Sequence, residues 1–218
     1  MKRDISETIG IGIILAISGG LMDAYSYICR GQVFANAQTG NILLLSISLS
    51  TGDISGFLHH FYPVVAFASG IALAILLRHL LSDHFRKHWQ LSVLFVEAAL
   101  LFTVAFISDD MTANSLISFA CGAQVESFQR ICGNKVATTM CIGNLRSAVS
   151  AATEYFYERQ NAELRDAMIY LIIIFAFSIG AIIGNVLIAC CTHKAIWGCS
   201  FLLVLAGAVL IRGMRVNK

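Results

Sequence analysis

Charged residues are scarce in this sequence, and proline is almost absent. Only 13% of the 218 residues are charged, about half the share of an ordinary soluble domain, whereas 57% are hydrophobic. A soluble fold of this size has too little interior to bury so much apolar surface. The single proline and the lack of low-complexity tracts argue against linkers and disordered tails. The composition therefore indicates an all-α polytopic membrane protein that forms a single membrane domain.

Paired cysteines and catalytic motifs are missing as well. The seven cysteines include no Cys-x-x-Cys pair, and most lie inside apolar runs, which is typical of buried thiols and not of disulfides or zinc ligands. No Gly-x-Ser-x-Gly motif, His-Glu-x-x-His motif or phosphate-binding glycine loop occurs. The sequence therefore predicts no enzyme activity, no cofactor and no metal site. An intramembrane enzyme that uses Asp23 or Glu97 is a weaker alternative.

Six segments are long and apolar enough to span a bilayer, which takes about 20 residues per helix. They cover residues 8–29, 61–81, 89–108, 113–131, 166–191 and 195–212. Two further apolar stretches, 39–51 and 142–153, have about half the length that the hydrocarbon core requires. The first segment continues past Ser18, beyond the apolar region of a signal peptide, and we interpret it as a membrane helix. A cleaved signal is the lesser alternative.

The two halves of the chain resemble each other when the sequence is shifted by 103 positions. Residues 19–41 then fall on residues 122–144 without a gap, and six of the 23 positions are identical. Asp23 falls on Glu126, and both stretches end in a Gly-Asn pair. Polar matches of this kind are poorly explained by chance similarity between apolar segments. We therefore predict two repeats, each built from a helix, a Gly-Asn half-helix and two helices, at about 8–108 and 113–212.

The placement of basic residues predicts how the two repeats are oriented. Basic residues favour the cytoplasmic side, and here they gather at the N-terminus, in residues 78–88 and at the C-terminus. If the two short stretches spanned fully, the 78–88 cluster would lie outside when the N-terminus is inside. If they are re-entrant, six crossings place all three clusters and both termini in the cytoplasm, and Asp109-Asp110 outside. Three crossings per half then make the repeats inverted relative to each other.

The Gly-Asn pairs stand at the start of the two predicted half-helices. Non-helical backbone at membrane depth is tolerated only where it is buried in protein or lines an aqueous cavity. Thr39 is the predicted N-cap of the first half-helix, and Gly40 and Gly143 would permit close backbone approach. Inverted symmetry would bring Asn41 and Asn144 together near the bilayer midplane. Paired helix N-termini there favour an anion or a carbonyl-bearing solute.

The candidate site residues are polar side chains around these two half-helices. They are Gln38, Thr39, Gly40, Asn41, Gln124, Thr138, Thr139, Gly143 and Asn144, with Asp23 and Tyr27 on the first helix and Glu126 at the repeat-related position. The alternative is that their hydrogen bonds only hold the re-entrant segments in place. Asp23 is either a solute or proton site or a structural acid that accepts from backbone amides of the loop.

Three other charged residues carry alternatives of their own. Glu126 is expected to form an i,i+4 ion pair with Arg130. Glu97 stands alone in an apolar run, so it is expected to be protonated or paired with a residue of another helix. Arg146 could supply that partner by approaching Asp23 or Glu97 in space. Gly70, Gly180 and Gly184 are expected to be points of close helix packing.

The stretch GGLMDAYSYICRGQVFANAQTGN resembles the N-terminal signature of the YoaK-like family of small bacterial integral membrane proteins. The matching residues are Gly20, Asp23, Ala24, Gly31, Phe34, Thr39, Gly40 and Asn41. The second half resembles a second signature of the family through Gly122, Gln124, Arg130, Thr138, Thr139, Gly143 and Asn144, with Val125 and Ile142 as departures. The resemblance covers nearly the whole chain. It implies a multi-pass location in a bacterial cytoplasmic membrane, and no particular substrate.

The sequence leaves two functions open. The first is a small-solute transporter or channel, with a small anion or polar metabolite as cargo and a site between the two Gly-Asn half-helices. The second is a membrane scaffold or accessory subunit without transport activity. The expected partners are the lipid bilayer and a small solute, and a homodimer is left open. The net charge of +2 comes from scattered residues, which argues against a nucleic-acid partner.

Overall fold

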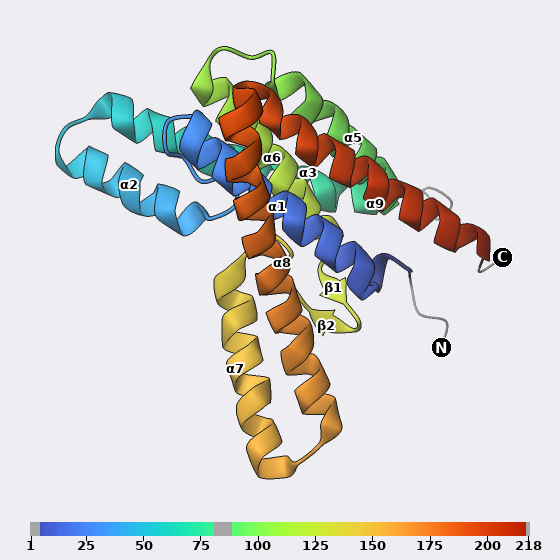
Figure 1. Ribbon diagram of the computed structural model, residues 1–218. Helices are drawn as coiled ribbons and strands as arrows, with labels where there is room; N and C mark the ends of the chain where they lie inside the picture. The colour runs from blue at the N-terminus through green and yellow to red at the C-terminus, as the bar shows by residue number, and fades with distance from the viewer. Residues whose placement is uncertain (1–4, 81–88, 217–218) are drawn as a thin grey trace.

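The computed structural model describes residues 5–80 and 89–216, and nearly all of them are helical (Figure 1). The α-helices are α1 (Ile9–Cys29), α2 (Gln38–Ser50), α3 (Ile54–Leu80), α5 (Trp89–Val104), α6 (Asp110–Ser127), α7 (Cys141–Glu158), α8 (Asn161–Cys191) and α9 (Trp197–Val216). Two short 3-10 helices, η1 (Ile5–Glu7) and η2 (Thr192–Ile196), precede α1 and α9. The strands β1 (Arg130–Ile131) and β2 (Asn134–Lys135) form an antiparallel hairpin before α7. The predicted all-α class is confirmed.

Helix length and composition separate the predicted crossings into two groups. Three helical stretches are long and apolar enough to cross a membrane, and they are Ile9–Cys29, Ile54–Leu80 and the combined α8–α9 stretch Asn161–Arg215. In contrast, α5 is apolar but has only 16 residues, and α6 has 18 residues with several buried polar side chains. The six-crossing arrangement therefore stays a prediction. The basic residues Lys2, Arg3, Arg86, Lys87 and Lys218, on which its orientation partly depends, lie outside the described residues.

The first helix of each half packs on the third helix of the other half. Helix α1 lies along α8, and α6 lies along α3. An added Cβ at Gly20 would overlap the Phe177 carbonyl oxygen, and one at Gly122 would overlap the Phe67 carbonyl oxygen. Small residues allow this close approach between helices in membrane bundles. The predicted packing role is confirmed for Gly70, Gly180 and Gly184, which face α6 or α1 in the same contacts.

Left-handed residues follow the first helix of each half, directly after α1 and in the β1–β2 turn that comes after α6. Gly31 and Gln32 follow α1 with φ of 75° and 61°, and Cys132 and Gly133 follow α6 with φ of 53° and 89°. Side chains with a Cβ disfavour this region, so Gln32 and Cys132 are held there by the surrounding structure. The chain then runs without helix to the start of α2 or α7. Each half thus has the same order of helix, reversal, irregular segment and second helix.

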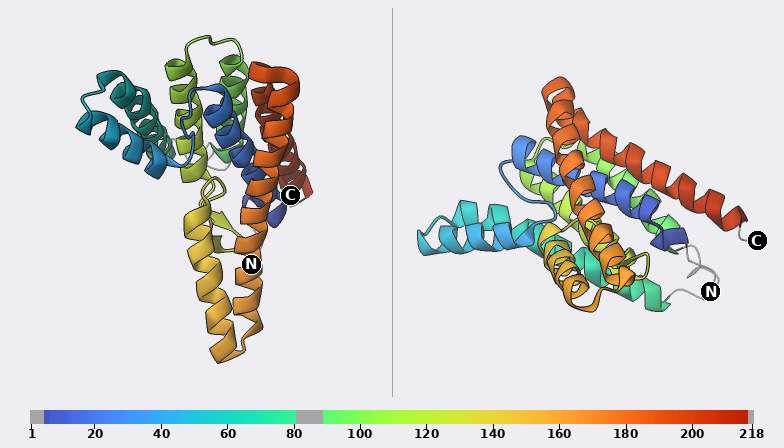
Figure 2. Two further views of the ribbon diagram at one scale, coloured as in Figure 1. Left: turned by 60° about the vertical axis from the view of Figure 1, so that its left-hand side comes forward. Right: turned by 60° about the horizontal axis from the view of Figure 1, so that its bottom comes forward.

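Two helical hairpins project from the central bundle in different directions. Figure 2 shows α7 and α8 extending from one side of the bundle, and α2 and α3 extending from another. Helix α2 buries only Asn41, and α7 buries only Asn144, Ala148 and Ala151. The other apolar residues of α2 are largely exposed, including Leu43 and Leu49. Only the start of each short helix is therefore inserted into the protein.

Candidate functional site

Asn41 closes the loop between α1 and α2. Its Oδ1 accepts from the Phe34 amide at 3.1 Å, and its Nδ2 donates to the Phe34 carbonyl oxygen at 2.7 Å. Nδ2 also donates to Gln38 Oε1 at 2.9 Å, and the Asn41 side chain is fully buried. The side-chain amide pairs with the backbone of Phe34 as a neighbouring strand would. Asn41 therefore satisfies the backbone of a segment that has no regular structure.

Asn144 makes the same pair of bonds to the backbone of a loop residue in the second half, and we call this arrangement the asparagine bracket. Its Oδ1 accepts from the Ala137 amide at 3.3 Å, and its Nδ2 donates to the Ala137 carbonyl oxygen at 2.7 Å. Nδ2 also donates to the Met140 carbonyl oxygen at 3.0 Å. In both halves the bracketed residue precedes the asparagine by seven positions. The two predicted asparagines thus share one local geometry, in which their amide groups are occupied internally.

Asp23 bonds to the start of α2 and not to an open cavity. Its carboxylate accepts from the Asn36 amide at 2.7 Å, and the neighbouring Ala35 amide donates to Ser26 Oγ at 3.1 Å. Helix α2 begins at Gln38, and its N-cap Ala37 contributes no side-chain bond, so the prediction that Thr39 is the N-cap is wrong. A carboxylate at a helix N-terminus offsets the partial positive charge there. Asp23 therefore supplies the negative charge that was expected from a bound anion.

Two buried oxygens lie where the loops of the two halves meet, beside Gly19. Asn36 Nδ2 donates to the Gly19 carbonyl oxygen at 3.1 Å, and an added Cβ at Gly19 would lie 3.0 Å from Thr139 Cγ2. Asn36 and Thr139 are related by the shift of 103 positions, and each is 1% exposed. Asn36 Oδ1 and Thr139 Oγ1 make no hydrogen bond to any described residue. An unpaired buried polar atom costs about 1–3 kcal/mol, so this pair is a candidate contact for a bound molecule.

The remaining predicted residues lie elsewhere or play other parts. Tyr27 is 42% exposed and stacks on Phe34, whose ring also covers Gly40. Gly143 is exposed with open space around it, so its expected close backbone approach is wrong. Glu126 forms an ion pair with Arg78 of α3 at 3.0 Å and not with Arg130, which lies in β1.

Gln124 links the second loop to the buried Glu97. Glu97 is 1% exposed, and Gln124 is fully buried. One end of the Gln124 amide lies 3.4 Å from Thr138 Oγ1, and the other lies 2.8 and 3.2 Å from the two Glu97 oxygens. Arg146 does not supply the predicted partner of Glu97, because it is exposed and lines a polar groove between α7 and α8. The partner of Glu97 is therefore a neutral amide.

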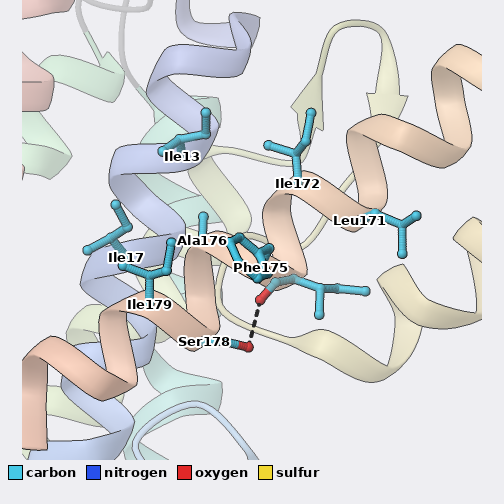
Figure 3. Close-up of a pocket in the computed structure, with 9 residues that line it drawn as sticks. Ile13, Ile17, Leu171, Ile172, Phe175, Ala176, Ser178 and Ile179 are labelled. Carbon is cyan, nitrogen blue, oxygen red and sulfur yellow. Dashed lines mark hydrogen bonds between the residues drawn. The ribbon is translucent and has the colours of Figure 1, made fainter.

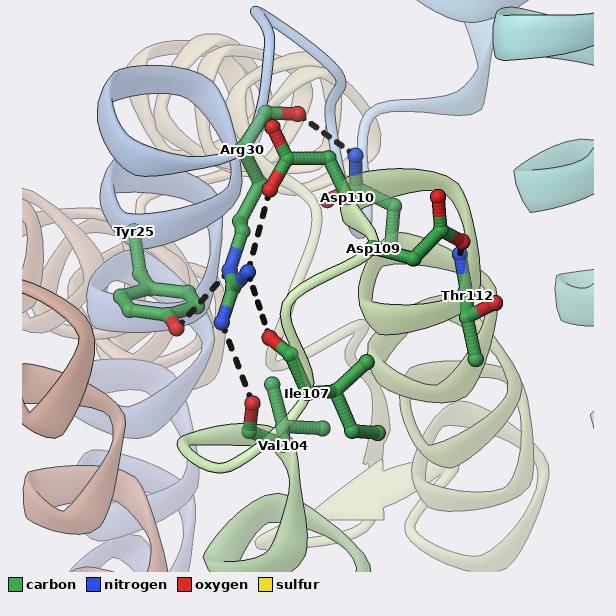
Figure 4. A network of polar contacts seen from close by, with 8 residues as sticks. Tyr25, Arg30, Val104, Ile107, Asp109, Asp110 and Thr112 are labelled. Atoms are coloured by element: carbon green, nitrogen blue, oxygen red, sulfur yellow. Dashed lines mark hydrogen bonds and ion pairs between the residues drawn. The ribbon is translucent and has the colours of Figure 1, made fainter.

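Arg30 is a buried charged residue that the sequence analysis missed (Figure 4). It is 1% exposed, and its Nε donates to the Tyr25 hydroxyl at 3.0 Å. Its Nη1 donates to Asp110 Oδ1 at 3.0 Å and to the Ile107 carbonyl oxygen at 2.9 Å, and its Nη2 donates to the Val104 carbonyl oxygen at 3.1 Å. The sequence does not reveal this pair, because Arg30 and Asp110 are 80 positions apart. Arg30 ties the first loop to the α5–α6 turn.

An apolar groove between α1 and α8 offers no polar contacts to a solute (Figure 3). Its volume is about 480 Å³, and Ile13 and Ile17 of α1 face residues of α8 such as Phe175 across it. Ser178 is the polar side chain in its lining, and its hydroxyl donates to the Ile174 carbonyl oxygen of its own helix at 3.1 Å. Such a lining suits the acyl chains of lipids better than a polar solute.

Long apolar helices, glycine-mediated helix contacts and a largely apolar exposed surface together define an integral membrane protein. Over residues 11–209 the chain matches the family described as "Protein of unknown function (DUF1275)", and it belongs to this family. It is also 25% identical over 193 residues to the UPF0700 transmembrane protein YoaK of Bacillus subtilis (strain 168), a match that covers 84% of this chain and 85% of that protein. The resemblance to the YoaK-like family is thereby confirmed. No solved structure matches the chain.

Proposed function

We propose that the protein is a small-solute transporter or channel whose solute binds between the two Gly-Asn half-helices, in contact with Asn36 Oδ1 and Thr139 Oγ1. The observation that carries the proposal is this pair of buried oxygens without partners. They come from repeat-related positions of the two loops, and the side chains that carry them both contact Gly19. The asparagine brackets nearby pair all of their polar groups, whereas these two oxygens, one from each loop, have no partner among the described residues.

The proposed architecture has six crossings and two re-entrant half-helices, arranged as two inverted repeats with both termini in the cytoplasm. Three observations support it. The asparagine brackets recur with the same spacing, the α1–α8 contact is mirrored by the α6–α3 contact, and α2 and α7 both begin inside the protein. In known transporters, interrupted helices at a repeat interface build the solute site near the bilayer midplane.

The proposed solute is a small polar molecule that carries N–H or O–H donors. Asn36 Oδ1 can only accept a hydrogen bond, and Thr139 Oγ1 can accept or donate. The nearby Asp23 carboxylate already accepts from the Asn36 amide at the start of α2. An anion would therefore meet acceptors and a negative charge, whereas a donor-bearing or cationic solute would meet complementary groups. A small anion is accordingly not retained as the preferred cargo.

Thr139→Val tests the proposed site. Purified protein in liposomes is screened with a panel of labelled amines, polyols and amino acids. The variant is expected to fold as well as the wild type, because it replaces an unpaired hydroxyl with a methyl group, and to lose at least tenfold in flux. The matched control is Thr153→Val on the exposed face of α7, where the hydroxyl bonds to its own helix. Unchanged flux in Thr139→Val, or no flux in the wild type, would contradict the proposal.

A membrane scaffold or accessory subunit is the second candidate function. The observation that favours it is the internal use of Asn41, Asn144 and Asp23, whose polar groups bond to their own loops. Crosslinking in native membranes tests this alternative, since a scaffold is recovered with a partner protein and shows no solute-dependent change in thermal stability. A thermal shift with one member of the solute panel would instead favour transport.

A further inference from the structure

Glu97 is a carboxyl group in the centre of the bundle without a basic partner. It lies on α5, is 1% exposed, and forms no ion pair with any Lys or Arg in residues 5–80 and 89–216. It also lines an apolar cavity of about 270 Å³ between α3, α5 and α6, to which Leu77 and Phe119 contribute. A carboxyl group in such surroundings usually carries a function when it is not paired with a charge.

The Gln124 amide can face Glu97 with either its nitrogen or its oxygen, and each choice fits a different charge state of Glu97. With Oε1 toward Glu97, two oxygens face each other at 2.8 Å, and this contact is a hydrogen bond only if Glu97 carries a proton. Gln124 Nε2 then donates to Thr138 Oγ1. In the inverted orientation Nε2 donates to an ionised Glu97, and the Thr138 hydroxyl becomes the donor to Gln124 Oε1.

We propose that Glu97 is a proton-binding site and that Gln124 relays its charge state to Thr138 in the second loop. Proton uptake from solvent by the Glu97 carboxylate inverts the amide and frees the Thr138 hydroxyl proton for another acceptor. Proton release restores the bond in which the Thr138 hydroxyl donates to Gln124 Oε1. Thr138 precedes Thr139 directly, so the hydrogen-bonding character of the loop at the proposed solute site changes with each proton. The link to transport rests on the proposed function, whereas proton binding by Glu97 does not.

Among the described residues, the titratable groups that interact with Glu97 are two buried thiols. The thiols of Cys121 on α6 and Cys199 on α9 interact electrostatically with Glu97. Cys121 also interacts electrostatically with Asp23 of α1. The part of α3 that lines the cavity is apolar. The nearest charged residues at the ends of α3 and α6 are Arg78 and Glu126, which pair with each other.

The test is an infrared pH titration of the purified full-length protein, which follows the carbonyl stretch of protonated carboxylic acids. We expect a band from the Glu97 carboxyl group that disappears as the pH rises and that Glu97→Gln lacks, whereas any band from Asp23 should remain in that variant. Glu126→Gln is the matched control, because this carboxyl group pairs with Arg78, and it should keep the band. In Gln124→Leu the band should persist to a pH about one unit higher, since the amide donor that stabilises the ionised carboxylate is gone.

Each outcome of the titration supports or overturns the proposal. The proposal is overturned if Glu97→Gln removes no band, or if Gln124→Leu does not shift the pH at which the Glu97 band disappears. If Glu97→Gln does not fold, Glu97→Asp takes its place, and an unshifted band in that variant counts against Glu97. The failure of the proposed function is distinguishable, because a protein without solute flux or binding can still show the Glu97 band. Conversely, flux that is independent of pH, together with no band, removes the relay and leaves the solute site intact.

Discussion

The two loop–helix junctions, at the starts of α2 and α7, share one arrangement of hydrogen bonds and differ in most of the contacts around it. Both use an asparagine to bracket a loop residue seven positions earlier. The first junction adds a carboxylate, Asp23, on a loop amide. The second junction has no acid in that place, and its loop is held by the β1–β2 hairpin and by a bond from the Cys132 amide to the Glu7 carbonyl oxygen.

The shared asparagine bracket is a requirement of the architecture, whereas the acid is a feature of the first half alone. The asparagine bracket occurs twice because each short helix begins inside the protein, where unpaired backbone groups are costly. The acid occurs once at a loop, and its counterpart Glu126 points instead to Arg78. We infer that the first junction is the rigid one and the second is the one able to change. The following predictions test this ranking.

Arg30→Met should cause the largest loss, because it strips the first junction of its anchor to the α5–α6 turn. The substitution leaves the Tyr25 hydroxyl, two carbonyl oxygens and Asp110 without their donor. Each neutral acceptor that loses its donor costs about 1–3 kcal/mol, whereas the Asp110 carboxylate is 43% exposed and adds little to the loss. Thermal unfolding in detergent measures the effect. Arg165→Met, which removes an exposed arginine paired with Asp166, is the control and should change stability by less than about 1 kcal/mol.

Asn41→Ala and Asn144→Ala should cause the next largest losses of stability, and the two losses should differ. Each leaves a loop amide and carbonyl group without a partner, at about 1–3 kcal/mol. Both asparagines make three bonds, but Asn41 is fully buried and accepts from its loop amide at 3.1 Å, against 3.3 Å for Asn144, so the loss at Asn41 should be the larger one. Unfolding midpoints and membrane accumulation of the two variants provide the comparison. An equal or reversed order would show that the first junction is not the more rigid.

Asp23→Asn should destabilise the protein more than Glu126→Gln. Asp23 accepts from a loop amide within the protein, and a neutral amide accepts this bond more weakly, at a cost of about 1–2 kcal/mol. Glu126 pairs with an Arg78 side chain that is 39% exposed, and such pairs contribute about 0–1 kcal/mol. Chemical denaturation of both variants in the same detergent gives the difference. A larger loss in Glu126→Gln would reverse the assignment of the structural acid.

The smallest effect is expected at Asp109, on the turn that Arg30 contacts. The bonds from Thr112 lower the pKa of this N-cap carboxyl below its usual value. A carboxyl whose folded pKa is lowered contributes stability above its unfolded pKa of about 3.9 and loses it as the pH falls through the folded pKa. Asp109→Asn keeps an N-cap but should remove this acid-dependent part. Unfolding temperatures between about pH 5 and 3 test it, and identical pH profiles would contradict the assignment.

Sequence alone predicted the features of the fold that depend on local periodicity. It located the α1 boundaries, helix α2 and the two asparagines, because apolar runs and Gly-Asn pairs are local signals. It found the start of α7 but not its length, since α7 continues past residue 153 to Glu158 and is as long as α6. It missed the Arg30–Asp110 pair and the meeting of Gly19 with Thr139, which join residues 80 and 120 positions apart. It also assigned the N-cap role to Thr39, because a distant carboxylate that replaces a cap is invisible to local rules.

The exchange of helix partners between the halves has a consequence for how the chain is made. The glycine surface of α1 is synthesised early, yet the groove that receives it includes Gly180 and becomes available only when most of the chain has left the ribosome. Until then the glycine surface of α1 contacts lipid in the membrane. Neither half can mature by itself, so a chain cut between α5 and α6 should yield two fragments that accumulate only when both are produced together.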